Sequence, residues 1–185
     1  MSETLLHHPD KKELDKLFPA IRKYQELATR HGIGDIFQDN GGKLLQALLI
    51  LNIQCMGSRE GNDARDADGN EYELKTVNVL LTSSFSTHHH LNPTILKKYR
   101  AVKAWYFSIY RGIELVEIYR VPPSDLERDY FGKWEAKWRA SGGRDINNPK
   151  IPVKYVKTKG RLVFAPQQTG DPSSQDATNP PPPAR

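Results

Sequence analysis

The chain has 185 residues, 37% of them hydrophobic, and a formal net charge of +5 at pH 7. This length fits one domain with a modest core, and no apolar run approaches the ~20 residues that span a bilayer. The single cysteine, Cys55, excludes an intrachain disulfide, and the opening residues lack the basic and apolar regions of a secretory signal. We therefore expect a cytoplasmic protein with no membrane partner.

The charge is spread unevenly along the chain. Residues 1–74 hold nine Lys or Arg and thirteen Asp or Glu, which gives a balance of −4. Residues 133–161 hold nine Lys or Arg against two acids, which gives +7. The basic segment either follows a phosphate backbone or forms a solvated face, and charge alone does not decide between them.

The first predicted element is an amphipathic helix over residues 10–31, with apolar residues at steps of three and four. The members of this apolar stripe are Leu14, Leu17, Phe18, Ile21, Tyr24, Leu27 and Ala28. The stripe either covers the core or faces a second subunit. A second helix is predicted from about Lys43, and it leads into a strand near Asn52.

Residues 61–75, GNDARDADGNEYELK, contain a strong hairpin signal, because Gly69 adopts positive φ without steric cost. The elements predicted after it are a strand over 72–81, a helix over 93–102, an antiparallel strand pair over 104–110 and 113–121, a helix over 122–140 and a basic hairpin over 150–161. This order predicts an α+β domain with a mixed sheet over residues 1–165. The tail, 166–185, is rich in proline and is predicted to be disordered.

The placement of the acids in residues 61–75 depends on the turn. A three-residue loop, Ala67–Gly69, sets a register in which Asp63 lies opposite Glu73, with Cβ atoms about 5 Å apart. Lys75, two residues beyond Glu73, then points to the same face. A two-residue loop would instead place Asp63 on the other face.

Two facing carboxylates repel each other, and a divalent cation allows both to stay ionised. Mg²⁺ favours one or two carboxylates, completed by waters and by phosphate oxygens of a substrate. A lysine beside the ion holds, orients or deprotonates the attacking water, and deprotonation requires that metal and burial lower the lysine pKa. The D-x9-E-x-K pattern is thus a coherent nuclease site. On its own, however, a surface hairpin with scattered charges explains it more simply.

Longer segments around this hairpin carry a more specific signal. They are GIGDIFQDNGGKLLQ, REGNDARDADGNEYELK, FSTHHHLNPTILKKYR, FSIYRGIELVEIYR and DINNPKIPVKYV. In order and spacing, and over roughly residues 9–156, they resemble the PvuII family of restriction endonucleases, within the PD-(D/E)xK nuclease superfamily. The chain departs from that pattern at ILNIQCMGSRE and in the tail.

The resemblance implies a type II restriction enzyme with a restriction-endonuclease-like fold, in which helices flank a mixed, mainly antiparallel sheet. It implies a homodimer that uses Mg²⁺ to cut double-stranded DNA at the palindrome CAGCTG, leaving blunt ends at the centre. The helix over 10–31 would be the dimerisation element. A cognate DNA methyltransferase is expected in the same host, without direct contact with this protein.

The resemblance also assigns roles within the catalytic hairpin, residues 60–80. Asp63 and Glu73 match the metal ligands, and Lys75 matches the catalytic lysine. Tyr99, in KKYR, matches a tyrosine near the metal and the scissile phosphate.

Residues 83–92 and 144–149 match the DNA-reading segments of the family. The expected DNA-binding residues are Asp39, Ser86, His89, His90, Asn147 and Asn148. A histidine donates to or accepts from guanine and cytosine edges, and an asparagine pairs with adenine. Asp39 matches a residue that reaches the minor groove, where its carboxylate accepts a hydrogen bond from the guanine amino group. The alternatives are a shared metal ion for the first and third histidines of HHH, and an ordinary turn for Asn-Asn-Pro.

Three functions remain as hypotheses. They are a sequence-specific endonuclease, a repair or junction nuclease built on the same hairpin, and a DNA-binding module without catalysis. A module that has lost catalysis should lack one of the acids or the lysine, and all three are present.

Overall fold

The computed structural model describes residues 8, 10–56 and 63–166. The helices in these ranges are α1 (Lys11–Arg30), α2 (Gly41–Leu51), α3 (Pro93–Ala101), α4 (Pro123–Leu126), α5 (Gly132–Ala140) and α6 (Val153–Lys159), and a π-helical turn, η1 (Glu127–Phe131), joins α4 to α5. The strands are β1 (Gln54–Cys55), β2 (Ala64–Arg65), β3 (Glu71–Asn78), β4 (Ser84–Ser86), β5 (Ala104–Arg111), β6 (Glu114–Val121), β7 (Lys150–Pro152) and β8 (Arg161–Phe164). The predicted tail, 167–185, lies outside the described residues.

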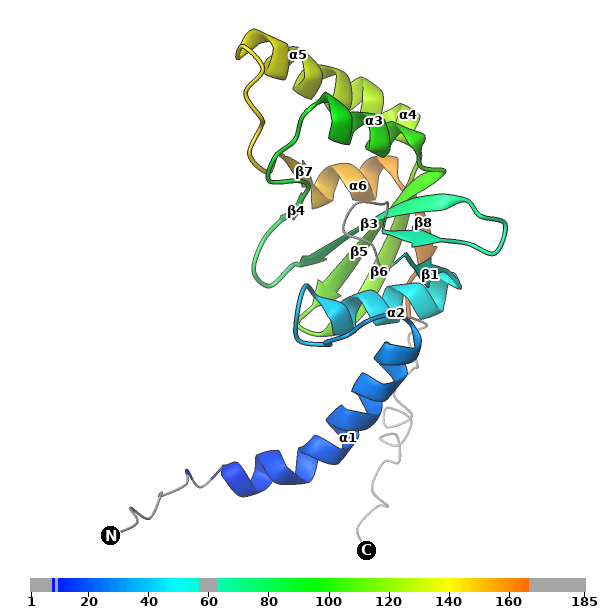
Figure 1. Cartoon of the computed structure of the whole chain (residues 1–185), viewed down its shortest axis with the longest axis vertical. Coiled ribbons are helices and arrows are strands. Elements are labelled where there is room, and N and C mark those ends of the chain that lie inside the picture. Colours follow the sequence, from blue (N-terminus) through cyan, green and yellow to red (C-terminus); the bar gives the residue numbers. More distant parts are fainter. Residues whose placement is uncertain (1–7, 9, 57–62, 167–185) are drawn as a thin grey trace, which may run out of the picture.

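One six-stranded sheet forms the centre of the domain, in the order β1-β2-β3-β5-β6-β8 (Figure 1). Only the β3–β5 pair of this sheet is parallel, since the chain passes through α3 between these strands, and the other pairs are antiparallel. β4 and β7 form a separate antiparallel pair. The predicted α+β class with a mixed, mainly antiparallel sheet and flanking helices is confirmed.

β5 and the elements packed on it hold the sheet rigid. Trp105, Phe107 and Ile109 are buried along this strand, which is flanked by β3 and β6. Phe85 of β4 packs edge-on against Phe107, with ring centroids 4.9 Å apart. Its cross-strand partner in β7, Ile151, is also fully buried. The β4–β7 pair is therefore anchored to the core by one face, and the residues on either side of Phe85 point outward.

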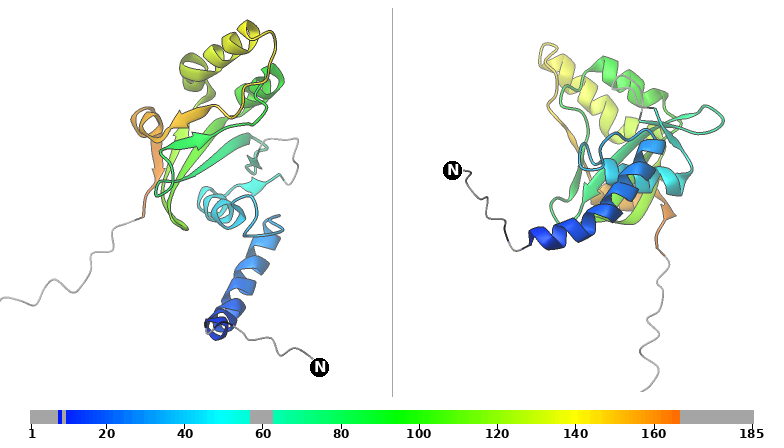
Figure 2. Two further views of the ribbon diagram at one scale, coloured as in Figure 1. Left: turned by 90° about the vertical axis from the view of Figure 1, so that its left-hand side faces the viewer. Right: turned by 60° about the horizontal axis from the view of Figure 1, so that its bottom comes forward.

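α1 divides the predicted apolar stripe between two environments. Its last turns pack on α2, where Ala28 is fully buried. Its first half extends away from the rest of the described chain (Figure 1, Figure 2), and Leu14, Leu17 and Phe18 are exposed there. The C-terminal end of the stripe therefore packs in the core. Of the helices in the described ranges, none combines the length and the apolar character that a membrane span requires.

The predicted basic hairpin over 150–161 is wrong. This segment folds as strand β7, helix α6 and strand β8. The sequence VKYVKTK is rich in β-branched residues, but Val153 and Val156 lie one helical turn apart and both pack on the core, so tertiary packing outweighs local propensity. The helix ends at Gly160, where an added Cβ would lie 2.6 Å from the carbonyl oxygen of Val156.

Candidate active site

The hairpin between β2 and β3 has the three-residue loop. Gly69 has φ of +83°, and its N–H donates to the carbonyl of Asp66 at 3.1 Å. The strands pair Ala64 with Tyr72, a register that places Asp63, the residue before Ala64, opposite Glu73. The side chain of Asp63 is also fixed from β3, because Oδ2 accepts the N–H of Leu74 at 2.8 Å. The predicted register is therefore confirmed.

Asp66 fastens the turn and was missed by the sequence reasoning. Its carboxylate accepts the backbone N–H of Asn70 at 2.9 Å and the hydroxyl of Tyr72 at 2.7 Å. Burial alone would raise the pKa of Asp66, but hydrogen bonds from Asn70 and Tyr72 lower it to about 2. The available signal was an Asp at the first position of a turn that ends in Gly, which is typical of type I turns.

Glu73 and Lys75 form an ion pair on the same face of β3. Lys75 Nζ lies 2.6 Å from Glu73 Oε1, and Glu73 is only 5% exposed. Burial raises the pKa of Glu73 to about 7, against the opposing effect of Lys75. Burial alone would lower the pKa of Lys75, but the Glu73 carboxylate more than offsets it and holds that pKa above its usual value. In this state Lys75 is a charged donor, which fits holding or orienting a water rather than deprotonating it.

Tyr99 lies behind the lysine in the core. Lys75 Nζ is 5.7 Å from the centroid of the Tyr99 ring and 5.8 Å from that of Trp105. Trp105 Nε1–H donates to the carbonyl of Tyr99 at 3.1 Å, which ties the two rings together. Burial raises the pKa of the Tyr99 hydroxyl, so the hydroxyl stays neutral and remains a donor. Tyr99 is 4% exposed, so it lies on the core side of the lysine and does not line the cavity that opens beside the hairpin.

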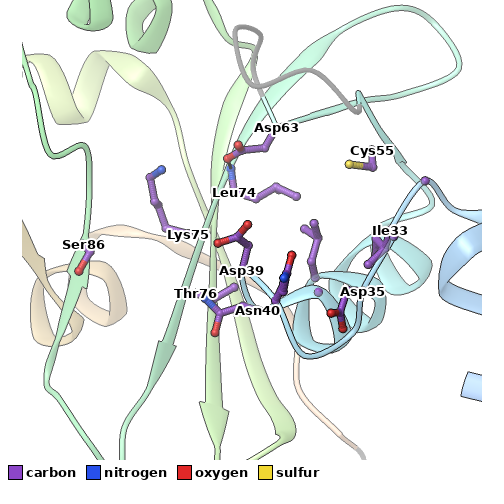
Figure 3. Close-up of a pocket in the computed structure, with 15 residues that line it drawn as sticks. Ile33, Asp35, Asp39, Asn40, Cys55, Asp63, Leu74, Lys75, Thr76 and Ser86 are labelled. Atoms are coloured by element: carbon purple, nitrogen blue, oxygen red, sulfur yellow. Dashed lines mark hydrogen bonds between the residues drawn. The ribbon is translucent and has the colours of Figure 1, made fainter. Parts of the chain in front are cut away.

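A cavity of about 770 Å³ opens beside the hairpin. Asp63, Lys75, Asp39 and Ser86 are among its lining residues and come from three separate segments: the hairpin, the loop before α2 and β4 (Figure 3). Thr76 and Cys55 also line it, and the sequence reasoning missed both. Thr76 lies in β3 of the hairpin, Cys55 lies in the neighbouring strand β1, and nothing in the local sequence marks them.

The loop before α2 carries Asp39 to this cavity. Asp39 and Asn40 have φ of +46° and +62°, in the left-handed region that Asp and Asn tolerate better than most residues. A Cβ at Gly41 would lie 2.3 Å from the carbonyl oxygen of Asp35, so only glycine fits there. The residues DNGG are thus explained by a tight loop, which places one predicted DNA-binding residue beside the candidate catalytic residues.

The two predicted DNA-reading segments are fastened to each other. β4 pairs with β7, and the N–H of Thr87 donates to Asn148 Oδ1 at 3.0 Å. The Thr87 hydroxyl donates to the carbonyl of Pro149 at 2.6 Å, and the N–H of Asn148 donates to the carbonyl of His88 at 2.9 Å. We call this joined structure, residues 83–92 with 144–152, the reading unit. Asn148 has φ of +45° and is partly buried, whereas Asn147 is exposed.

The three histidines of the reading unit differ in their surroundings. His88 Nδ1 accepts the N–H of His90 at 3.0 Å, and both burial and the charge of Lys75 lower the pKa of His88. A neutral His88 therefore carries its proton on Nε2. His89 and His90 are exposed, and His90 Nδ1 lies 3.9 Å from Asp145 Oδ2. Ser86 and Asp39 reach the cavity wall; the two exposed histidines and both asparagines lie outside it.

The donor set at the hairpin fits a small divalent cation. Within residues 8, 10–56 and 63–166, no group of three or more His, Cys, Asp or Glu side chains is arranged to hold a metal ion by itself, so a shared ion at the first and third histidines would lack a third ligand of these types. Asp63 and Glu73 face each other, and their hydrogen bonds use Oδ2 of one and Oε1 of the other. Each carboxylate has a second oxygen, and two carboxylates completed by water and phosphate oxygens are the ligands that Mg²⁺ favours.

A protein-family model described as restriction endonuclease PvuII matches residues 9–164 of the chain. The chain belongs to this family. It is therefore a type II restriction endonuclease, a hydrolase that cleaves double-stranded DNA at specific sites as part of a restriction–modification system. Its α+β architecture is that of the restriction-endonuclease fold, and enzymes of this kind generally use a divalent metal ion. The DNA-binding module without catalysis is thereby set aside.

Proposed function

We propose that this enzyme is a homodimer that uses Mg²⁺ to cleave the palindrome CAGCTG at its centre, leaving blunt ends. One observation carries the chemical part: Asp63 lies opposite Glu73, with Lys75 Nζ 2.6 Å from the Glu73 carboxylate. The cavity beside this group also reaches Ser86 of the reading unit. The choice of CAGCTG rests on the family segments FSTHHHLNP and DINNP.

In this proposal Asp63 and Glu73 would hold the metal ion. When bound, the ion stabilises negative charge on the reacting phosphate. Lys75, charged in the pair with Glu73, donates a hydrogen bond that orients the attacking water along the line to the phosphorus. The ring of Tyr99 contacts this lysine on its core side, and its hydroxyl is a neutral hydrogen-bond donor. The Leu74 N–H bond keeps the Asp63 carboxylate directed toward β3.

Base recognition in this proposal belongs to the reading unit and to the loop before α2. His89, His90 and Ser86 read the two G·C pairs of each half-site, and Asn147 and Asn148 read adenine. Asn148 Oδ1 already accepts the Thr87 N–H, but a carbonyl oxygen has two lone pairs, so one remains for the adenine amino group. Asp39, on the cavity wall, accepts from a guanine amino group in the minor groove.

The two-fold symmetry of a palindrome calls for two copies of the chain. The first half of α1 exposes Leu14 at 45%, Leu17 at 52% and Phe18 at 39%. This apolar surface supports a dimer contact through α1. A restriction enzyme that cuts CAGCTG also requires a cognate methyltransferase in its host, which acts on DNA and makes no contact with this chain.

The test is to incubate the full-length protein with plasmid DNA and Mg²⁺ and to sequence the ends of the products. Discrete blunt fragments, cut between CAG and CTG, are expected, with no cutting in EDTA. Discrete ends at another sequence would refute the CAGCTG assignment, and random nicks would refute the proposal as a whole. Faster cutting of branched DNA than of linear duplex would favour a junction nuclease. Glu73→Gln serves as the control for a contaminating nuclease, because it should bind DNA without cutting it.

A further inference from the structure

Ser86 and Lys150 form a pair on the outer face of the reading unit. They are cross-strand partners in the β4–β7 pair, and Lys150 Nζ lies 2.6 Å from Ser86 Oγ. Their neighbours Phe85 and Ile151 are fully buried, so Ser86 and Lys150 point away from the core. Ser86 also lines the cavity that Asp63 and Lys75 share (Figure 3).

This contact restricts the hydrogen bonds that the serine can make. A lysine ammonium group has three N–H donors and no acceptor, so Ser86 Oγ must accept from Lys150. A serine without such a neighbour rotates its hydroxyl freely, and it either donates to or accepts from a base edge. With Lys150 on one of the two lone pairs of Oγ, the adjacent positive charge disfavours a second donor on the other lone pair and favours the Ser86 O–H as a donor to an acceptor.

We propose that Lys150 is a specificity-determining positioning residue, which makes Ser86 a hydrogen-bond donor to a guanine at the major-groove edge. This inference rests on the proposed function, in which Ser86 contacts a G·C pair. Guanine presents two acceptors in the major groove, N7 and O6, whereas cytosine presents an amino donor. A serine that donates, with an ammonium group beside it, therefore favours G·C over C·G at the same position. A freely rotating serine would tolerate both.

The competing explanation is that Lys150 binds a phosphate and contributes no sequence information. Lys154 provides the matched control. It is an exposed lysine four residues further along, on α6, and it makes no contact with Ser86. Lys157 is less suitable, because its Nζ lies 2.6 Å from Glu117 Oε2.

The experiment measures single-turnover cleavage by the full-length enzyme in Mg²⁺, on CAGCTG and on symmetric variants that each reverse one base pair. Lys150→Met should reduce discrimination at one G·C position by about fivefold to tenfold and leave discrimination at the other positions unchanged. Ser86→Ala should lose the same discrimination, and adding Lys150→Met to it should change nothing further. Lys150→Arg, which still donates, should retain most of it, and Lys154→Met should lower the cleavage of all sites alike.

Three results would overturn the inference. One is a uniform loss on all sites, with a salt slope of binding reduced by about one, which identifies a phosphate contact. Another is that the losses of discrimination in Ser86→Ala and Lys150→Met add up in the double variant. The third is wild-type discrimination in Lys150→Met. A thermal unfolding midpoint close to wild type excludes misfolding, and Ser86→Ala tests the same position if Lys150→Met is unstable. If the wild-type protein shows no site preference, the proposed function is refuted, and the proposed role of Lys150 is refuted with it.

Discussion

Replacing Lys75 with methionine removes the one cation that lies 2.6 Å from the buried Glu73 carboxylate. Methionine has a similar length and is apolar, so it packs against the Tyr99 and Trp105 rings beside which the lysine lies. If Lys75 orients the attacking water, the single-turnover rate should fall by a factor of roughly 100 to 10,000. This loss corresponds to about 3–5 kcal/mol of barrier.

The same substitution should change how stability depends on pH. Removing one partner of a buried ion pair costs up to about 3–5 kcal/mol when the other charge is left alone. Glu73 can instead become protonated. Its pKa in the fold, about 7, already lies above the ordinary value of 4.5, and this pKa should rise further without Lys75. A folded-state pKa above the unfolded value means that stability falls as pH rises through that window. Lys75→Met should therefore be destabilised more at pH 9 than at pH 6.

The assay separates chemistry from binding. Single-turnover cleavage is followed in Mg²⁺, DNA binding is measured in Ca²⁺ without cleavage, and urea unfolding is measured at both pH values. Lys103→Met is the matched control, since Lys103 is 46% exposed and lies 3.7 Å from Asp66. The double variant Glu73→Gln with Lys75→Met should lose the pH dependence, as no buried charge remains. Cleavage by Lys75→Met within tenfold of wild type would refute the assigned role, and so would an equal loss of binding and cleavage.

Three further changes test the hairpin and the helix α1. Gly69→Ala should lower the free energy of unfolding, measured by urea titration, by about 1–2 kcal/mol, because φ of +83° penalises a Cβ. The control is Gly34→Ala, where nothing lies within 4 Å of an added Cβ, and it should change the free energy of unfolding less. Asp66→Asn should reduce the loss of stability that acid produces between about pH 4 and pH 2, because the pKa of Asp66 is lowered to about 2 and the wild type loses this contribution as the carboxyl is protonated. Identical acid profiles would contradict this prediction. Leu17→Glu should convert a dimer to a monomer in sedimentation equilibrium, whereas Lys12→Glu should leave the dimer intact.

The local part of the site was predictable because its information is local. Glycine is the only residue type that takes positive φ without cost, so Gly69 marked the hairpin, and strand alternation put Lys75 on the same face as Glu73. The sequence left open whether the loop has two or three residues, and the three-residue loop places Asp63 opposite Glu73. The predicted face and register are confirmed. The direction of the Lys75 pKa shift was not predictable from spacing. It depends on the balance between the burial of Lys75, which lowers its pKa, and the Glu73 charge, which raises it.

Contacts between distant segments lay beyond the sequence pattern. Thr87 bonds to Asn148 and Pro149, more than sixty residues away, and neither end of this contact has a pattern of its own. The segment 150–161 was misassigned for a related reason. Its alternating β-branched residues favour strands, but the buried position of Val156 makes a helix the better packing. Local preference decides a segment only where the surrounding structure leaves it exposed.

The connection between β3 and β4 links recognition to chemistry. Asn78, at the end of β3, accepts the N–H groups of Leu80 and Gly112 on its side-chain oxygen, at 3.1 and 3.0 Å. Its backbone carbonyl accepts the N–H of Thr82 at 3.1 Å. The short connection is thereby bound to the β5–β6 turn, and Phe85 fastens β4 to β5 at the other end.

A connection held at both ends cannot slide. These contacts restrict the position of Ser86 relative to Glu73 and Lys75 on β3. In the proposed function, the bases that the reading unit contacts would then determine which phosphate reaches the proposed catalytic residues. Cutting at a fixed position within a recognised sequence requires such a link, because a flexible connection would let several phosphates enter. Asn78 and Phe85 form this link, and neither is a proposed metal ligand or DNA-binding residue.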